Sequence, residues 1–172
     1  MSLGGVYPLD MDYLKTVKRM IISYRPFQVS DHLCFTSHDG QHFNDLLPIP
    51  FTPDSLRHVS ERISAVQDIL DTRLLVENVS SYLQFEASEM SETEFINELA
   101  ARTGCGILLD INNVYVSACN NGFDPKTYLD SVDPLLVVEI HLAGHSVEKL
   151  PDGELRIDDH GSPVIEEVWN LY

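Results

Sequence analysis

Four short apolar runs in this chain each end in a side chain that can bind a metal ion. The four terminal residues are His32, Glu77, Asp110 and His141. A continuous apolar run is typical of a strand buried on both faces of a parallel sheet. The carboxyl ends of such strands meet at one edge, where parallel α/β proteins place their chemistry. The succession of four therefore predicts a functional site at that edge.

A later segment adds the pair Asp158 and His160 to this set. Alternate residues of a strand share a face, so we pair these two and expect Asp159 to lie on the opposite face. Adjacent parallel strands lie ~4.8 Å apart, which lets side chains at neighbouring strand ends converge on one ion or two. Imidazole and carboxylate groups without thiolates favour iron, manganese or zinc over a structural cysteine-zinc site.

Several polar residues directly follow these strand ends. Asn78, Asn112 and Asn113 each come after a predicted ligand, and either orient it by hydrogen bonding or cap the next turn. His145 lies just beyond the fourth strand in a glycine-containing loop, where it would contact substrate or orient His141. It is the catalytic residue that we predict apart from the metal ligands.

The segments between the apolar runs predict helices, which gives a repeated β/α order. We expect helices at 8–24, 53–70, 92–103, 125–130 and 163–172, from apolar spacing, prolines at helix starts and a capping box at Ser91–Glu94. We expect strands at 27–32, 73–77, 106–110 and 136–141, and a short strand or ribbon at 155–161. The polar segment 36–50 predicts a long loop.

This α/β alternation predicts a parallel sheet with right-handed crossovers. A complete (β/α)₈ barrel needs ~250 residues, so a chain of 172 fits an open sheet or the middle of a barrel. The first helix has no strand before it, which favours the barrel piece. We therefore expect one domain, residues 1–172, forming a partial TIM barrel of about four to five βα units without the first and last strands. Its free edges favour pairing with another chain, as in a homo-oligomer.

Composition and charge exclude several classes of protein. The net charge is −16, with 27 Asp and Glu against 11 Lys and Arg, so phosphate backbones and anionic membranes are unsuitable partners. No segment has the ~20 apolar residues of a membrane span, and the first residues do not resemble a signal peptide. These features favour the cytoplasm. Cys34, Cys105 and Cys119 are odd in number and lack a C-x-x-C pair, which suits a reducing compartment.

Five strings in this chain resemble the multinuclear non-haem iron-dependent oxidative enzymes. That family includes the oxidase of methanobactin biosynthesis and many proteins long described as uncharacterised. The resemblance covers nearly the whole chain, in order, through Ser30-Asp31-His32-Leu33, Leu75-Val76-Glu77-Asn78-Val79-Ser80-Ser81-Tyr82, Leu109-Asp110-Ile111-Asn112-Asn113-Val114-Tyr115-Val116-Ser117, Glu139-Ile140-His141-Leu142-Ala143-Gly144-His145 and Ile157-Asp158-Asp159-His160-Gly161.

The resemblance implies a xylose isomerase-like TIM barrel that holds two or three irons. It implies oxidative modification of cysteine in a ribosomally made precursor peptide, often with a separate peptide-recognition partner. The residues that match family iron ligands are His32, Glu77, Asp110, His141, Asp158 and His160. Two more family ligands, an early His and a late acidic residue, lie outside the sequence given, and Asn120-Asn121-Gly122 stands where the family often has Asn-His-Gly.

Two other functions remain open from the residues alone. The same barrel type with manganese or zinc serves sugar isomerases and epimerases, which need a Glu or Lys base over the substrate. All four lysines lie away from the strand ends, which weakens this alternative; they are Lys15, Lys18, Lys126 and Lys149. The other alternative is a non-catalytic fragment that binds metal weakly or supports a partner.

Overall fold

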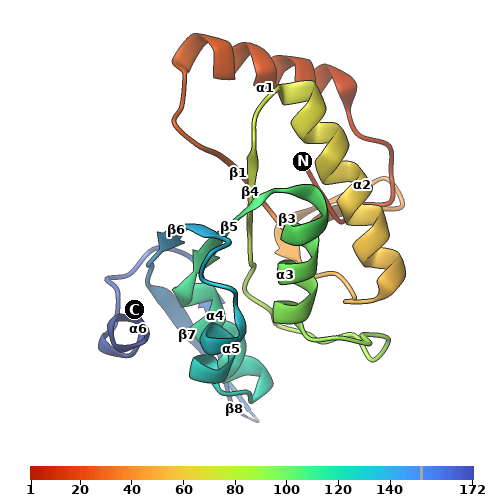
Figure 1. Cartoon of the computed structure of the whole chain (residues 1–172). Helices are drawn as coiled ribbons and strands as arrows, with labels where there is room; N and C mark the ends of the chain where they lie inside the picture. Colours follow the sequence, from red (N-terminus) through yellow and green to blue (C-terminus); the bar gives the residue numbers. More distant parts are fainter. Residues whose placement is uncertain (152) are drawn as a thin grey trace.

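A four-stranded parallel sheet organises the protein (Figure 1). The computed structural model describes residues 1–151 and 153–172. The sheet order is β1-β4-β5-β6, with β1 at Val29–His32, β4 at Leu74–Glu77, β5 at Gly106–Asp110 and β6 at Val137–His141. The four predicted strands are therefore present, each ending at the residue expected. The fold is mixed α/β, as the alternation of elements predicted.

Helices alternate with the strands and pack on one another. They are α1 (Met11–Tyr24), α2 (Pro53–Leu70), α3 (Glu92–Thr103), α4 (Ile111–Asn121), α5 (Pro125–Ser131) and α6 (Glu166–Leu171). Helix α2 contacts both α1 and α3, and α4 contacts α5 and α6. The expected ends of α2 and α3 are confirmed, since Thr52 caps α2 ahead of Pro53 and Gly104 ends α3 in the left-handed conformation. Helices α1 and α6 begin three residues later than the predicted positions 8 and 163.

The hydrophobic core lies between the sheet and the helices α2 and α3. Strand β4 is buried on both faces, and so is β5, which explains their unbroken apolar sequence. The apolar stripe of α2 and the fully buried Phe95 of α3 cover the sheet. Cys34 and Cys105 are buried and unpaired, whereas Cys119 is exposed. The rigid core therefore fixes the positions at which β4 and β5 end.

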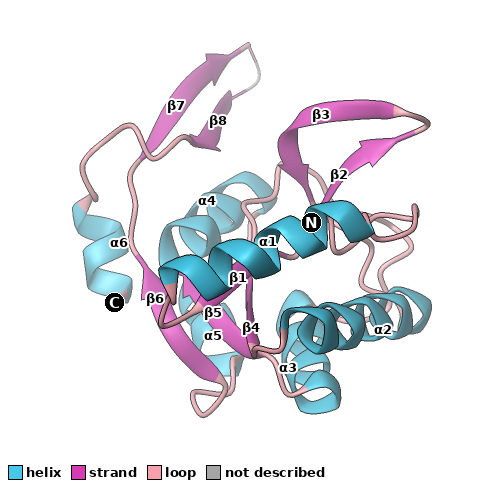
Figure 2. Cartoon of the chain, turned by 90° about the horizontal axis from the view of Figure 1, so that it is seen from above, coloured by secondary structure: helices cyan, strands magenta, loops and turns pink. Residues whose placement is uncertain are grey.

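Two antiparallel hairpins leave the sheet where its edge strands end. One consists of β2 (Phe35–His38) and β3 (Gln41–Leu47), which follow β1. The other consists of β7 (His145–Leu150) and β8 (Gly153–Asp158), which follow β6. Figure 2 shows them at opposite flanks of the molecule. The prediction of a long loop over 36–50 is wrong, because the segment pairs with itself through a bulged register between Phe35 and Ser37.

Two further elements differ from the sequence prediction. Helix α4 begins directly after β5, because the Asp110 side chain accepts a hydrogen bond from the backbone N–H of Asn113 and so caps the helix. The sequence pattern predicted no helix between residues 110 and 125. His145 is not in a loop but is the first residue of β7, where it pairs with Asp158.

Among the described residues, no helix is both long enough and apolar enough to cross a membrane.

Candidate metal centre

The register of the sheet sets how far the end of each of the four strands extends relative to its neighbours. His32 pairs with Glu77 across β1 and β4, and Asp110 pairs with His141 across β5 and β6. Between β4 and β5, however, Glu77 pairs with Leu108, so Asp110 lies two residues further along its strand. This stagger is the tilt that neighbouring parallel strands adopt when a sheet curves. The four side chains therefore gather around one edge rather than in a straight row.

Glu77, Asp110 and His141 form the centre of this group. One potential ligand atom from each lies within 4.8 Å of the others. Glu77 is 5% exposed and Asp110 is fully buried, whereas the imidazole of His141 reaches solvent. A buried carboxylate pair beside an accessible imidazole is the donor set of a site that binds a hard or borderline metal ion.

Both outer strands of the sheet contribute a histidine to the Glu77 carboxylate. His32 Nε2 lies 3.2 Å from Glu77 Oε2, and His141 Nδ1 lies 3.3 Å from Glu77 Oε1. His141 Nε2 lies 3.4 Å from Glu139 Oε1. Glu139 was missed by the sequence analysis, although its place two residues before His141 puts both on one face of β6. The two imidazoles and the carboxylates can thus share one ion or orient each other.

The two carboxylate oxygens of Asp110 differ, because one accepts a hydrogen bond and the other has no hydrogen-bond partner among the described residues. Its Oδ1 accepts the hydrogen bond from Asn113 N at 2.8 Å, whereas Oδ2 is buried without a hydrogen-bond partner among the described residues. Burial, with the nearby charges of Glu77 and Asp158, raises the pKa of Asp110 to about 6, against the lowering effects of Asn113 and His160. A buried, unpartnered carboxylate oxygen costs free energy unless a proton or a cation meets it.

Asp158 and His160 lie at the border of the three central residues. His160 Nδ1 is 2.9 Å from Asp158 Oδ1, and His160 Nε2 is 4.0 Å from Asp110 Oδ2. Their pairing was predicted from strand alternation, but β8 ends at Asp158. Instead, a left-handed backbone at His160 (φ 51°) turns its ring back towards Asp158. The Tyr82 hydroxyl accepts a hydrogen bond from Asp158 N at 3.2 Å and holds this end of the hairpin.

Asn78 and Asn113 fix the end of β5. The Asn78 amide accepts from Asp110 N at 2.9 Å and donates to Asp110 O at 3.0 Å, so it replaces a missing strand partner. Asn113 Nδ2 donates to Asn78 O at 2.9 Å. All three residues are buried. Two asparagines thus hold the Asp110 backbone in place and leave its Oδ2 free.

Asn112 joins His145 to the border pair. Its Nδ2 donates to Asp158 Oδ1 at 2.8 Å, and its Oδ1 lies 2.9 Å from His145 Nδ1, which therefore carries the proton. The His145 ring lies against Tyr115 at 5.4 Å, and Arg156 lies over the same tyrosine. Burial, followed by the charge of Arg156, lowers the pKa of His145. The neutral imidazole is thus linked to Asp158 through Asn112, and no hydrogen bond joins it to His141 in the described part of the chain.

The arrangement fits a metal ion on two grounds. The donor atoms are carboxylate oxygens and imidazole nitrogens, the types that iron, manganese and zinc accept. The Oδ2 atom of Asp110, buried without a hydrogen-bond partner among the described residues, is available to bind a cation at the middle of the group. The residues that would hold such an ion are Glu77, Asp110 and His141, with His32 beside them.

Comparison with known proteins identifies the family to which the chain belongs. Over residues 1–172, the chain matches the family described as "RiPP precursor modification enzyme MbnB/TglH/ChrH", where RiPP denotes a ribosomally made, post-translationally modified peptide. The protein belongs to this family. The resemblance to multinuclear non-haem iron-dependent oxidative enzymes that the sequence strings carried is therefore confirmed at the level of the family.

Similar proteins occur in several bacteria under the name UPF0276 protein. The chain is 48% identical over 173 residues to one from Paraburkholderia phytofirmans, covering 100% of this chain and 56% of the relative. It is 46% identical to one from Vibrio vulnificus and 49% identical to one from Anaeromyxobacter, covering 100% of this chain and 59% of each relative. The chain therefore spans less than two thirds of the length of these relatives.

Proposed function

We propose that this protein is part of an iron-dependent oxidative enzyme that modifies cysteine in a ribosomally made precursor peptide. The observation that carries the proposal is the convergence of Glu77, Asp110 and His141, with the unpartnered Oδ2 of Asp110, in a chain of the RiPP-modifying family. Iron, when bound, would supply the one-electron redox chemistry that the side chains lack.

Each group of side chains has its own task in this proposal. Glu77, Asp110 and His141 hold the first ion, with His32 on the β1 side, and Asp158 with His160 supplies ligands for a second. Asn78 and Asn113 keep Asp110 in position through the backbone of β5. His145 is proposed to act through Asn112, which orients the Asp158 carboxylate. The net charge of −16 suits a peptide rather than a nucleic acid as the substrate.

The same proposal covers the architecture and partners. The sheet, with its stagger and outer helices, is proposed to be part of a xylose isomerase-like (β/α)₈ barrel, formed by residues 1–172 as one domain. Its outer strands β1 and β6 each pair on one side only in the described structure, so they are available to further strands of a longer chain or a second copy. A peptide-recognition partner and a cytoplasmic location belong to the proposal as well.

Iron content measured under anaerobic conditions tests the proposal. After incubation with Fe(II) and desalting, we expect at least one iron per chain in the parent by mass spectrometry. His141→Ala should lose most of it, because one of the three converging donors disappears. His38→Ala is the matched control, since His38 is an exposed histidine of the β2–β3 hairpin outside the group.

Three outcomes would contradict the proposal. Absence of iron above background in the parent would remove the metal centre itself. A clear preference for manganese over iron in competition would favour the sugar isomerase alternative, because a site of these ligand types normally binds manganese more weakly than iron. Equal iron content in parent and His141→Ala would place the ion elsewhere.

A further inference from the structure

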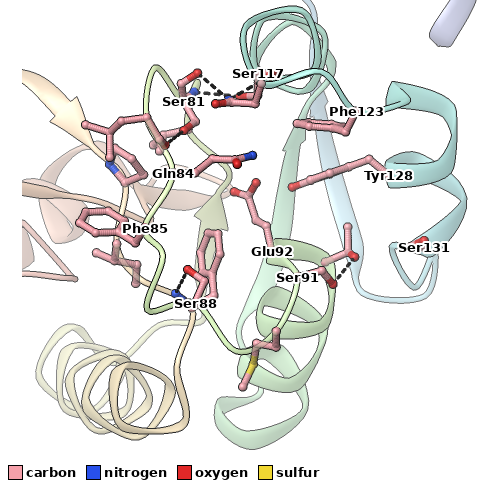
Figure 3. Close-up of a pocket in the computed structure, with 18 of the residues that line it drawn as sticks. Ser81, Gln84, Phe85, Ser88, Ser91, Glu92, Ser117, Phe123, Tyr128 and Ser131 are labelled. Carbon is pink, nitrogen blue, oxygen red and sulfur yellow. Dashed lines mark hydrogen bonds between the residues drawn. The ribbon is translucent and has the colours of Figure 1, made fainter.

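A cavity lies outside the metal centre, lined in part by the long connection between β4 and α3. Its volume is about 550 Å³, within the range of ligand sites in proteins. Its walls come from three parts of the chain: the segment 48–51, the β4–α3 connection with the start of α3, and the α4–α5 turn with α5. Figure 3 shows Glu92 and Tyr128 projecting into it from α3 and α5 and facing each other.

The charged side chains that line this cavity are all acidic. Glu92 and Asp124 contribute carboxylates, and no Lys, Arg or His is found among its described lining residues. Asp124 already accepts hydrogen bonds from Thr127 N and Oγ1 at the start of α5. Glu92 is therefore the carboxylate available to a ligand. An anion is disfavoured here despite the nearby start of α3, because both carboxylates would repel it.

Tyr128 supplies an independent sign of a ligand. It is only 9% exposed, and its hydroxyl is buried without a hydrogen-bond partner of good geometry among the residues described. Burial, followed by the charge of Glu92 and a weak contact of the hydroxyl with its carboxylate, holds the pKa of Tyr128 well above its ordinary value, so the hydroxyl stays protonated. A buried hydroxyl without a well-formed hydrogen bond is rare in a folded protein, because it costs ~1–3 kcal/mol. A ligand donor between Tyr128 and Glu92 would satisfy both groups.

The remaining walls suit an apolar stem. Phe51, Phe85 and Phe123 lie around the cavity, and the Phe123 ring stacks against Tyr128 at 6.0 Å. Aromatic faces attract a cation by their negative quadrupole, and they also cover methylene groups. Serine and threonine residues also line the cavity, among them Ser81, which follows Glu77 by four positions. The cavity and the metal centre thus share one connecting segment.

We propose that this cavity binds an organic cation with an apolar stem, an ammonium or guanidinium group that donates to the Glu92 carboxylate and the Tyr128 hydroxyl. Its source is a lysine or arginine side chain of a peptide, or a free alkylamine. The peptide source rests on the proposed function, whereas the cation site itself does not. Binding strengthens as the pH rises, because burial raises the pKa of Glu92 to about 7, partly opposed by Tyr128, and only the ionised carboxylate attracts a cation.

NMR titration of the whole chain with defined probes tests the site. The probes are Nα-acetyl-lysine methylamide, its uncharged analogue Nα-acetyl-norleucine methylamide, and n-butylammonium. We expect the lysine probe to bind about tenfold or more tightly than the norleucine probe, because a hydrogen bond to a charged group is lost in the latter. The chemical shift changes should map to the cavity residues, and the affinity should fall from pH 8 to pH 6.

Variants at and away from the cavity complete the test. Glu92→Gln should weaken lysine binding about tenfold and remove its pH dependence, and Tyr128→Phe should weaken it severalfold. Glu98→Gln is the matched control, because Glu98 lies on the same helix and pairs with Arg102 at the surface. Circular dichroism and thermal melting establish that each variant is folded before titration.

The outcomes separate the possibilities. Tighter binding of the lysine probe than of n-butylammonium supports a peptide side chain, and equal binding supports a free amine. Equal binding of lysine and norleucine probes would overturn the cation site, as would unchanged lysine affinity in a folded Glu92→Gln variant. None of these results depends on iron, so failure of this site and failure of the oxidative function remain distinct.

Discussion

Substitution of Asp110 by asparagine should raise the stability of the metal-free protein and abolish its response to metal. The amide oxygen of the new side chain would keep the hydrogen bond from Asn113 N, because asparagine caps helices as well as aspartate does. The change removes a buried charge at Oδ2, which has no hydrogen-bond partner among residues 1–151 and 153–172. The variant thus separates the fold from the proposed ligand role.

The magnitude follows from the pKa of Asp110. A rise from 3.8 to about 6 corresponds to about 3 kcal/mol of unfavourable free energy in the ionised form. Because the folded state holds the proton more tightly, this loss of stability develops as the pH rises from 3.8 through about 6. At pH 8 in EDTA, Asp110→Asn should therefore melt roughly 6–12 °C above the parent, at ~2–4 °C per kcal/mol for a chain of this size.

Metal binding should make the parent more stable than Asp110→Asn. At a free metal concentration one thousand times its dissociation constant, the parent gains about 4.1 kcal/mol, which exceeds its deficit of about 3 kcal/mol, whereas Asp110→Asn gains little. Differential scanning calorimetry with EDTA and with Fe(II) under anaerobic conditions measures both. The control is Asp124→Asn, which makes the same change at the exposed cap of α5 and should leave the metal response unchanged.

Two results would contradict this account of Asp110. A lower melting temperature of Asp110→Asn than of the parent in EDTA would mean that the buried carboxylate stabilises the metal-free fold. Equal stabilisation of both proteins by Fe(II) would mean that Oδ2 of Asp110 is not a ligand. At pH 4, where the carboxyl is largely protonated when folded, the difference between the two proteins should be small.

Three more predictions concern the surroundings of the site. Asn78→Ala should lower the free energy of unfolding in urea by ~2–4 kcal/mol, because two buried backbone groups of Asp110 lose their partners; a loss below ~0.5 kcal/mol would contradict this. The free energy of unfolding of the parent should fall as the pH rises from 4.5 to about 7, because the buried Glu92 carboxyl then loses its proton, and Glu92→Gln should abolish this fall. Melting curves at pH 5 and pH 8 that show the same pH dependence in both proteins would argue against it. Gly144→Ala should reduce iron affinity while far-UV circular dichroism stays unchanged, because the new Cβ would lie 2.0 Å from Ser162 O and displace the segment after His160; unchanged affinity and stability would disprove that close approach.

Local sequence signals predicted the central sheet and its end residues well. The strands β4 and β5 are apolar up to their last residue, and the carboxylate that follows each apolar run marks where the strand ends, although Glu77 and Asp110 are themselves buried. Helix α4 was missed because Asn112, Asn113 and Asn120 disfavour helix by propensity. Tertiary contacts override this preference, since Asn112 bonds to Asp158 and Asn120 bonds to Arg156 across the hairpin.

The hairpins show a second reason for failure. The segment 36–50 carries polar residues, and its pairing depends on a bulge that one-dimensional alternation does not reveal. The link from His145 through Asn112 to Asp158 likewise joins residues far apart in sequence. The cavity between Glu92 and Tyr128 gave no sequence signal either, because its walls come from three separate segments.

The residue types that end the strands can be read from the chain alone, because burial on both faces allows only apolar side chains before them. The family can be read in the same way, through five strings spread along the chain. How these residues meet depends on the folded protein. The stagger between β4 and β5 brings Glu77, Asp110 and His141 within 4.8 Å, and the Asn78 amide holds β5 at that height. Register depends on contacts between strands, which no single segment encodes.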